Sequence, residues 1–139
     1  MAVKQHERTI ARRCALQALY QSEIMGCAVE DILNGTVSVP VELELDDYAR
    51  RLVEGVGAGK ASIDADIKEA SENWALDRMP VVDRSLLRLA VFEMLNVEDV
   101  PVSVSINEAV ELAKEFGGED ESHRFVNGIL GRIAKGIEE

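Results

Sequence analysis

The sequence is short of cysteines, aromatic residues and long hydrophobic runs. Two of its 139 residues are cysteines, Cys14 and Cys27, and neither has a second Cys or a His at ligand spacing. We expect both thiols to be reduced, and we expect no metal and no other cofactor. No apolar run approaches the ~20 residues that a membrane helix needs, and the charged N-terminus is unlike a signal peptide. The chain is therefore expected to work in the cytoplasm, without a membrane.

The sequence also lacks a recognisable catalytic motif. The stretch 55–60 resembles a phosphate-binding loop, but Glu54 and Ala61 stand where such a loop has glycine and Ser or Thr. Acidic residues spaced like Asp64 and Asp66 point to different faces of a helix and converge poorly on one substrate. No G-x-S-x-G sequence occurs, and no cysteine has a credible histidine partner. We predict that the protein is not an enzyme.

What the sequence does have is helical periodicity. Hydrophobic residues make up 47% and charged residues 29% of the chain, which is a normal balance for a folded protein. A chain of this length can form one compact domain over residues 1–139. Apolar residues recur at spacings of three and four, and no stretch alternates like a sustained strand, so the fold class is predicted to be all-α. The predicted helical segments are 8–25, 29–33, 42–70, 74–79, 81–95, 105–116 and 122–136.

Two short patterns give more local expectations. Glycines at 55, 57 and 59 weaken a helix, so the segment 42–70 either breaks there or uses the glycines for close packing by a neighbour. Ser105 and Glu108 have the S-x-x-E spacing of a capping box. We therefore expect the helix that ends before Gly117 to begin at Ser105.

Charge is unevenly distributed along the chain. The net charge is −11, which argues against nucleic acid as a partner, but the first 22 residues carry +3 and the remaining 117 carry −14. The basic N-terminal segment, about residues 1–13, could grip phosphate while the acidic body repels other polyanions. The alternative is an ordinary solvated start of a helix.

A second candidate site feature lies near the C-terminus. Phe125 can stack on a base and Asn127 can bond to a base edge, a combination that suits single-stranded RNA. We expect the first and last helices to lie side by side, so that cations from one and the aromatic and amide groups from the other form a shared cradle. The alternative for Phe125 is a place in the core. The candidate RNA-binding residues on these two helices are Lys4, Arg8, Arg12, Arg13, Arg124, Phe125 and Asn127.

Three stretches resemble the NusB-type transcription antitermination factors. They are RRCALQALYQSE at 12–23, PVVDRSLLRLAVFEML at 80–95 and VPVSVSINEAVELAKEFGGEDESHRFVNGIL at 100–130. The order of these motifs is far more specific than any single helical pattern. The resemblance implies about seven helices in two packed bundles, and a protein that performs no chemistry.

The resemblance also implies partners and site residues. Members of this family bind the boxA element of nascent leader RNA, together with a small-subunit ribosomal protein called NusE, in a complex on RNA polymerase. Some members self-associate, so a homodimer stays open. By motif, the RNA-binding residues would be Arg8, Arg12, Arg13, Tyr20, Phe125 and Asn127, and the candidate contacts with the ribosomal protein would be Asp77 and Asp83.

Two departures from the family pattern and two other functions stay open. Glu7, Thr9 and Ile10 interrupt the arginine run, and either Asp120 or Glu121 could take the family's acidic position beside the RNA. The chief alternative function is a helical adaptor whose basic first helix binds an acidic protein. A less favoured one is the RNA-docking domain of a methyltransferase, although the sequence shows no methyl-donor site.

Overall fold

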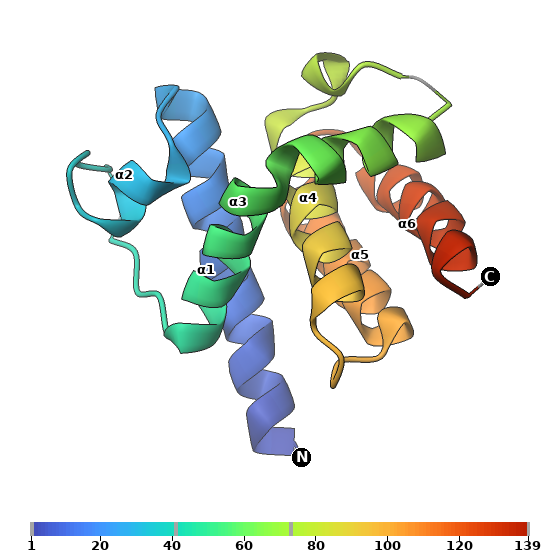
Figure 1. The fold of residues 1–139 in the computed structure, drawn as a ribbon, viewed down its shortest axis with the longest axis horizontal. Coiled ribbons are helices and arrows are strands. Elements are labelled where there is room, and N and C mark those ends of the chain that lie inside the picture. The colour runs from blue at the N-terminus through green and yellow to red at the C-terminus, as the bar shows by residue number, and fades with distance from the viewer. Residues whose placement is uncertain (1, 41, 73, 139) are drawn as a thin grey trace.

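The computed structural model describes residues 2–40, 42–72 and 74–138, and the side chains of residues 5–40, 42–72 and 74–137. Within these ranges the chain forms six α-helices and one 3-10 turn, with no strand, so the predicted all-α class is confirmed (Figure 1). None of the helices in these ranges is both long and apolar enough to cross a membrane. The elements are α1 (Ala2–Met25), α2 (Val29–Leu33), α3 (Asp47–Ala70), the 3-10 turn η1 (Leu76–Arg78), α4 (Val81–Asn96), α5 (Val102–Phe116) and α6 (Ser122–Glu138).

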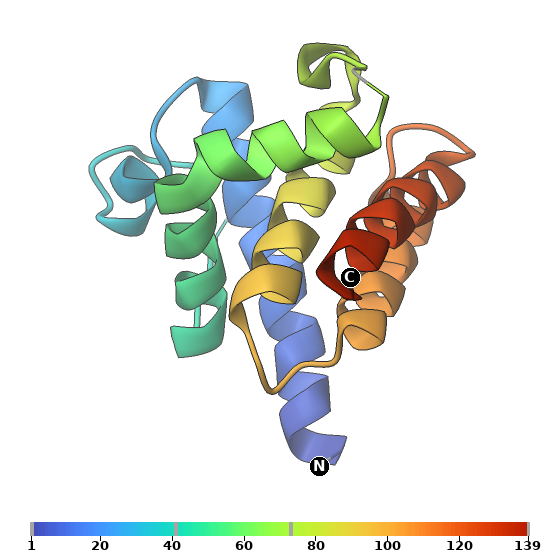
Figure 2. The ribbon, with the colours of Figure 1, turned by 45° about the vertical axis from the view of Figure 1, so that its right-hand side comes forward.

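Helix α4 is the centre of the fold. It packs against α1, α3, α5 and α6, and both ribbon views show it between an α1–α3 group on one side and an α5–α6 pair on the other (Figures 1 and 2). Leu86, Leu87 and Val91 are completely buried on it. Burying side chains of this size stabilises the fold by about 1.5–3 kcal/mol each, which explains why this segment is apolar on nearly every face.

Helix α3 runs unbroken through its glycines because two of them allow close packing. A Cβ atom added to Gly55 would lie 2.1 Å from two carbons of the Phe92 ring, and one added to Gly57 would lie 2.4 Å from Val29 Cγ2. At Gly59 the nearest side-chain atom would be Ile63 Cδ1 at 3.5 Å, an ordinary contact. The close-packing alternative is therefore the one that the structure adopts.

Adding a methyl group at these glycines is expected to have opposite effects. Gly55→Ala should lower the free energy of unfolding by about 1–3 kcal/mol, because the Phe92 ring must move out of a packed position. Gly59→Ala, the matched control, should leave stability unchanged or raise it by up to about 1 kcal/mol through helix propensity. Urea denaturation of both variants measures the difference. Equal stability of the two variants would contradict the close-packing role of Gly55.

Three predicted helix starts are wrong. Helix α1 begins at Ala2 rather than Arg8, and α3 begins at Asp47 rather than Glu42, because Asp46 caps it by accepting a hydrogen bond from Ala49 N at 2.8 Å. Helix α5 begins at Val102, three residues before the predicted capping box. Ser105 is instead fully inside the helix, where its hydroxyl donates to the buried carboxylate of Glu93 at 2.7 Å.

An ion-pair cluster joins the C-terminal end of α1 to α3 and α4. The carboxylate of Glu23 accepts from Arg88 and Arg84, and Lys60 Nζ lies 3.9 Å away. Burial acts to raise the pKa of Glu23, but these cations, Arg88 above all, lower it by more, so the pKa lies below its ordinary value. Arg88 also binds Asp64 at 2.8 Å, which completes the cluster.

This cluster predicts a loss of stability in acid. Because the folded pKa of Glu23 lies below the unfolded value of about 4.3, its contribution is present above that pH and is lost as the pH falls through the folded pKa. Glu23→Gln should therefore be less stable than the parent protein at pH 7, and the gap should close below about pH 4. Urea denaturation at a series of pH values tests this. A gap that stays constant from pH 7 to pH 3 would contradict the assignment.

Candidate RNA-binding surface

Arg12 is buried, so its predicted place among the RNA-binding cations of the first helix is wrong. Only 4% of the residue is exposed. Its Nε atom donates to both carboxylate oxygens of Glu93 at 3.0 and 2.9 Å, and Nη1 donates to Glu108 at 2.9 Å. The guanidinium group therefore lies in the seam where α1 meets α4 and α5. Two carboxylates from those helices compensate its buried charge.

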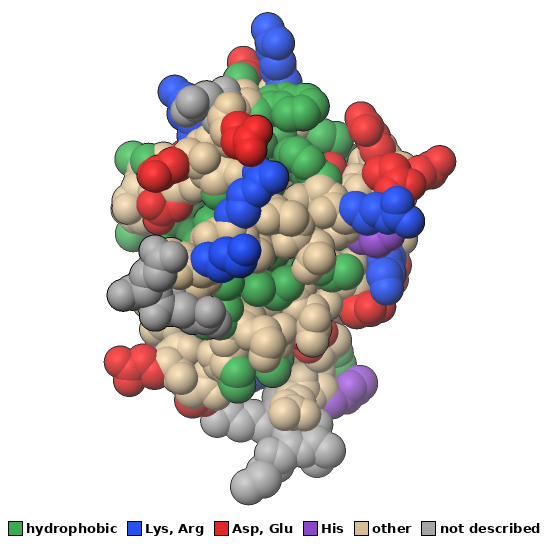
Figure 3. All heavy atoms as spheres, turned by 90° about the vertical axis from the view of Figure 1, so that its right-hand side faces the viewer, with side chains coloured by type: hydrophobic (Ala, Val, Ile, Leu, Met, Phe, Trp, Pro, Cys, Tyr) green, Lys and Arg blue, Asp and Glu red, His purple; other side chains and the backbone are tan. Residues whose placement is uncertain are grey.

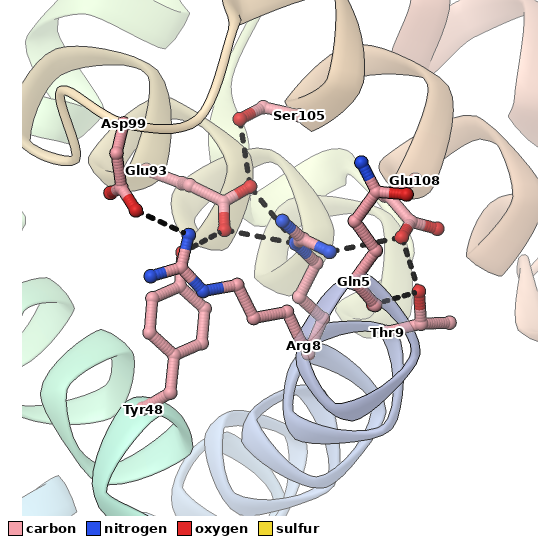
Figure 4. A network of polar contacts seen from close by, with 9 residues as sticks. Gln5, Arg8, Thr9, Tyr48, Glu93, Asp99, Ser105 and Glu108 are labelled. Carbon is pink, nitrogen blue, oxygen red and sulfur yellow. Dashed lines mark hydrogen bonds and ion pairs between the residues drawn. The ribbon is translucent and has the colours of Figure 1, made fainter. Parts of the chain in front are cut away.

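Glu93 is the hub of the polar network around Arg12 (Figure 4). Besides Arg12, its carboxylate accepts hydrogen bonds from Ser105 Oγ and from the hydroxyl of Tyr48. Burial raises the pKa of Tyr48 well above its ordinary value, and the hydrogen bond to Glu93 raises it further. Because these residues come from α1, α3, α4 and α5, the network fixes the position of α1 against the other three helices.

Arg8 lies at the edge of the same network. Its Nη1 atom is 3.0 Å from Asp99 Oδ2, and its guanidinium carbon lies 4.4 Å from the centre of the Tyr48 ring (Figure 4). Its side chain is 17% exposed. Arg8 is thus mostly engaged within the protein rather than projecting toward solvent. Lys4, the other basic residue predicted on this row, lies in the first turn of α1, and its side chain is outside the described part of the chain.

Arg13 is the most accessible arginine of α1. Its Nη1 and Nη2 atoms donate to the two carboxylate oxygens of Glu115 at 2.6 and 2.8 Å. The Arg13 and Glu115 side chains are 42% and 45% exposed. The guanidinium carbon also lies 5.2 Å from the centre of the Phe116 ring. The hydrogen bond to Glu115 is the main reason that the pKa of Arg13 is raised, so the group stays cationic throughout.

Beside Arg13 is a shallow hollow, which we call the first hollow, with a volume of about 280 Å³. Its walls are mostly apolar, with two glutamines and the Tyr20 and Phe116 rings, dimensions and chemistry that suit one unpaired base. Tyr20, one of the predicted RNA-binding residues, is among the residues that line this hollow. The lining residues are Arg13, Leu16, Gln17, Tyr20, Gln21, Val82 and Phe116.

A second hollow, of about 230 Å³, lies on the other side of the start of α4. The Phe125 ring is half-buried in its wall, and its centre lies 5.9 Å from that of the Trp74 ring at an angle of 70°. Phe125 packs on the core and faces the hollow, so neither predicted alternative describes it alone. The lining residues are Trp74, Arg78, Met79, Pro80, Asp83, Glu119, Glu121, Ser122 and Phe125.

The predicted direct pairing of the first and last helices is wrong. Helix α1 packs on α2, α3 and α4, whereas α6 packs on α3, α4 and α5 (Figures 1 and 2). The start of α4 instead contributes to the walls of both hollows, because Val82 lines the first and Pro80 and Asp83 line the second. The physical reason is that the apolar central helix takes the place between α1 and α6.

A family model described as the NusB family matches residues 9–135. The chain belongs to the NusB family. The transcription antitermination protein NusB of Anaeromyxobacter dehalogenans strain 2CP-1 is 49% identical over 94% of this chain and 92% of its own length. That of Listeria monocytogenes strain HCC23 is 45% identical, over 92% and 96%.

Solved structures of the NusB family share the fold. NusB of T. maritima superposes with a TM-score of 0.80 at 40% sequence identity, covering 92% of this chain and 90% of that chain. A chain from a crystal structure of antitermination factors NusB and NusE in complex with dsRNA superposes with a TM-score of 0.73 at 26% identity, covering 93% and 96%. The all-α class implied by the resemblance to the NusB family is therefore confirmed, although the described residues form six α-helices and a 3-10 turn where about seven helices were expected.

The NusB-family motif around FVNG lies only partly at the hollows. Phe125 lines the second hollow, but Arg124 and Asn127 are exposed on α6 and are not among the described residues that line either one. Arg124 pairs with Glu121 at 3.2 Å. Of the two acidic candidates, Glu121 lines the second hollow and Asp120 does not.

Asp83 was expected to contact the ribosomal protein, but this expectation is wrong because its side chain is buried. Asp83 is 2% exposed, accepts from Ser122 Oγ at 2.9 Å and lies 3.3 Å from Gly118 N. It holds the start of α6 against α4. Asp77, in η1, is exposed. Together with Trp74 it lines a further shallow depression.

Two aromatic residues at the hollows were not predicted. Phe116 is the last residue of α5, and Trp74 is 55% exposed in the loop before η1. An aromatic residue directly before a helix-ending glycine, as in Phe116-Gly117, is the signal that could have found the first. On the face that carries α6, Lys and Arg side chains stand in small groups among acidic and hydrophobic ones (Figure 3). The cations coloured in this view therefore do not merge into one broad basic patch (Figure 3).

Proposed function

We propose that this protein is a transcription antitermination factor. It binds boxA-type single-stranded leader RNA together with the ribosomal protein NusE, in a complex on RNA polymerase. The observation that carries the proposal is the pair of aromatic-walled hollows to which the start of α4 contributes. A NusB relative of similar fold has been solved with NusE and dsRNA. Family membership supports the same role for this chain.

The hollows bind RNA bases, whereas the polar and cationic residues contact the RNA backbone or base edges or hold α1 in place. One unpaired base enters the first hollow, between Tyr20 and Phe116, and another stacks on Phe125 in the second. Arg124 and Asn127, which are exposed on α6, contact the RNA backbone or base edges. Lys4, whose side chain lies outside the described part of the chain, adds a phosphate contact from α1. Arg8 and Arg12 act indirectly, because their guanidinium groups are held by Asp99, Glu93 and Glu108 and keep α1 in place.

The protein performs no chemistry in this role and works in the cytoplasm, where nascent RNA is made. Described residues contain no group of three or more metal-ligating side chains. The ribosomal protein contacts the depression beside Trp74 and Asp77, next to the second hollow. In that position NusE lies beside the RNA that binds at the second hollow.

Fluorescence anisotropy tests the proposal. A boxA-like RNA, a scrambled RNA of the same length and a double-stranded form of the boxA-like RNA are each titrated with the protein, with and without NusE. The proposal expects the single-stranded boxA-like RNA to bind tightest, with NusE tightening it further. Weak binding without preference in both states would favour the adaptor function instead. Preference for the duplex would contradict the base-stacking role of the hollows.

A further inference from the structure

Arg13 is held in an unusual way for a residue that is meant to bind RNA. A guanidinium group has five N–H donors arranged in a planar fork that fits a carboxylate or a phosphate equally well. The Glu115 carboxylate already occupies that fork with two hydrogen bonds, at 2.6 and 2.8 Å. Glu115 thus stands where an RNA phosphate would otherwise bind.

The same pairing fixes how Arg13 faces the first hollow. The guanidinium group lies over the Phe116 ring at 5.2 Å while its fork points to Glu115, and the residue forms part of the wall of the hollow. A planar guanidinium group is itself a surface on which a base can stack. Arg13 can thus serve as a stacking wall for a base in the first hollow, while its N–H fork is already occupied by Glu115.

The Arg13–Glu115 pair contributes little to the stability of the fold. Both side chains are nearly half exposed, unlike the Arg12–Glu93 pair, and exposed pairs contribute little to stability. Glu115 joins no other described hydrogen bond or ion pair apart from the one with Arg13. The Arg13–Glu115 pair therefore mainly affects which ligands Arg13 can bind.

We propose that Glu115 is a specificity-determining residue of the RNA site: it holds Arg13 as a stacking wall for one base and withholds its charge from phosphate. The inference rests on the proposed RNA-binding function. Sequence-independent binding comes from cation–phosphate contacts, so a cation that is paired internally adds nothing to it. An RNA that places a base in the first hollow still gains from Arg13, because stacking does not require the Glu115 pair to break.

Glu115→Gln is the decisive variant, with Glu111→Gln as its matched control. Both remove one negative charge from the exposed face of α5, but Glu111 pairs with Lys114 rather than with Arg13. Anisotropy titrations of boxA-like and scrambled RNA, in the presence of NusE and at several salt concentrations, give the affinities and their salt slopes. Thermal unfolding of each variant verifies that the fold is intact.

We expect Glu115→Gln to bind scrambled RNA about three- to tenfold more tightly at low salt, with a log–log salt slope steeper by about 0.7, as one new phosphate contact requires. Binding of boxA-like RNA should change less than about twofold, so the ratio of the two affinities falls. Glu111→Gln should change both RNAs equally and leave the ratio as it is.

Other outcomes overturn the inference in distinguishable ways. If Glu115→Gln tightens both RNAs by the same factor, or matches Glu111→Gln, then Glu115 acts only through net charge or not at all. If the parent protein with NusE fails to prefer boxA-like over scrambled RNA, the proposed function itself fails, and the inference fails with it.

Discussion

Replacing Arg12 with methionine is expected to lower the free energy of unfolding by about 3–5 kcal/mol. The substitution keeps much of the side-chain volume but leaves the Glu93 carboxylate, which is 2% exposed, without its compensating cation. Removing one partner of a buried ion pair is costly because the remaining charge stays desolvated. Urea denaturation followed by circular dichroism measures the change.

Arg13→Met is the matched control for that experiment. It removes an arginine that is also paired with a glutamate on α5, but the pair is nearly half exposed. Its effect should therefore stay within about 1 kcal/mol. Similar losses for the two variants would contradict the distinction between a buried Arg12 that fixes α1 and an accessible Arg13 that faces RNA.

The second large effect is expected on RNA binding. Phe125→Leu should weaken the binding of boxA-like RNA by about 1–3 kcal/mol, because leucine fills apolar volume on the core side but has no π-face for a base. Anisotropy with NusE present measures the loss. Keeping an aliphatic side chain matters here, since Phe125 also packs against the hydrophobic core.

Phe92→Leu is the control for the loss of an aromatic ring. Phe92 is also half-buried, but its ring packs against Gly55 of α3 and lines neither hollow among the described residues. Its substitution should leave RNA affinity within about twofold of the parent value. Unchanged affinity in Phe125→Leu, with the fold intact, would remove Phe125 from the proposed site.

Much of the helical framework could be predicted from the sequence, because amphipathic periodicity is a local property. Residues 81–95 form α4 almost as predicted, and the ends of α1 and α5 coincide with Gly26 and Gly117. The helix starts were harder to predict. Ser105 has the spacing of a cap but is recruited by Glu93, a residue on another helix.

The candidate site was predicted less well, because its arginines form ion pairs with residues that are far away in the sequence. Arg12 reads as a surface cation in the helical pattern, yet it is buried against Glu93, 81 residues away. Arg13 meets Glu115 at a separation of 102 residues. The charges of Arg8, Arg12 and Arg13 are thus balanced within the fold, which net charge along the chain cannot reveal.

The proposed function requires that unpaired nucleotides bind to one surface, which is formed by α1, the start of α4 and the loop between α5 and α6. NMR titration of the isotope-labelled protein, in complex with unlabelled NusE, with boxA-like RNA tests this directly. We expect the amide shifts to change chiefly at residues 13–21, 82–83 and 116–125. Changes confined to the outer face of α3, or identical changes with scrambled RNA, would contradict the proposed function.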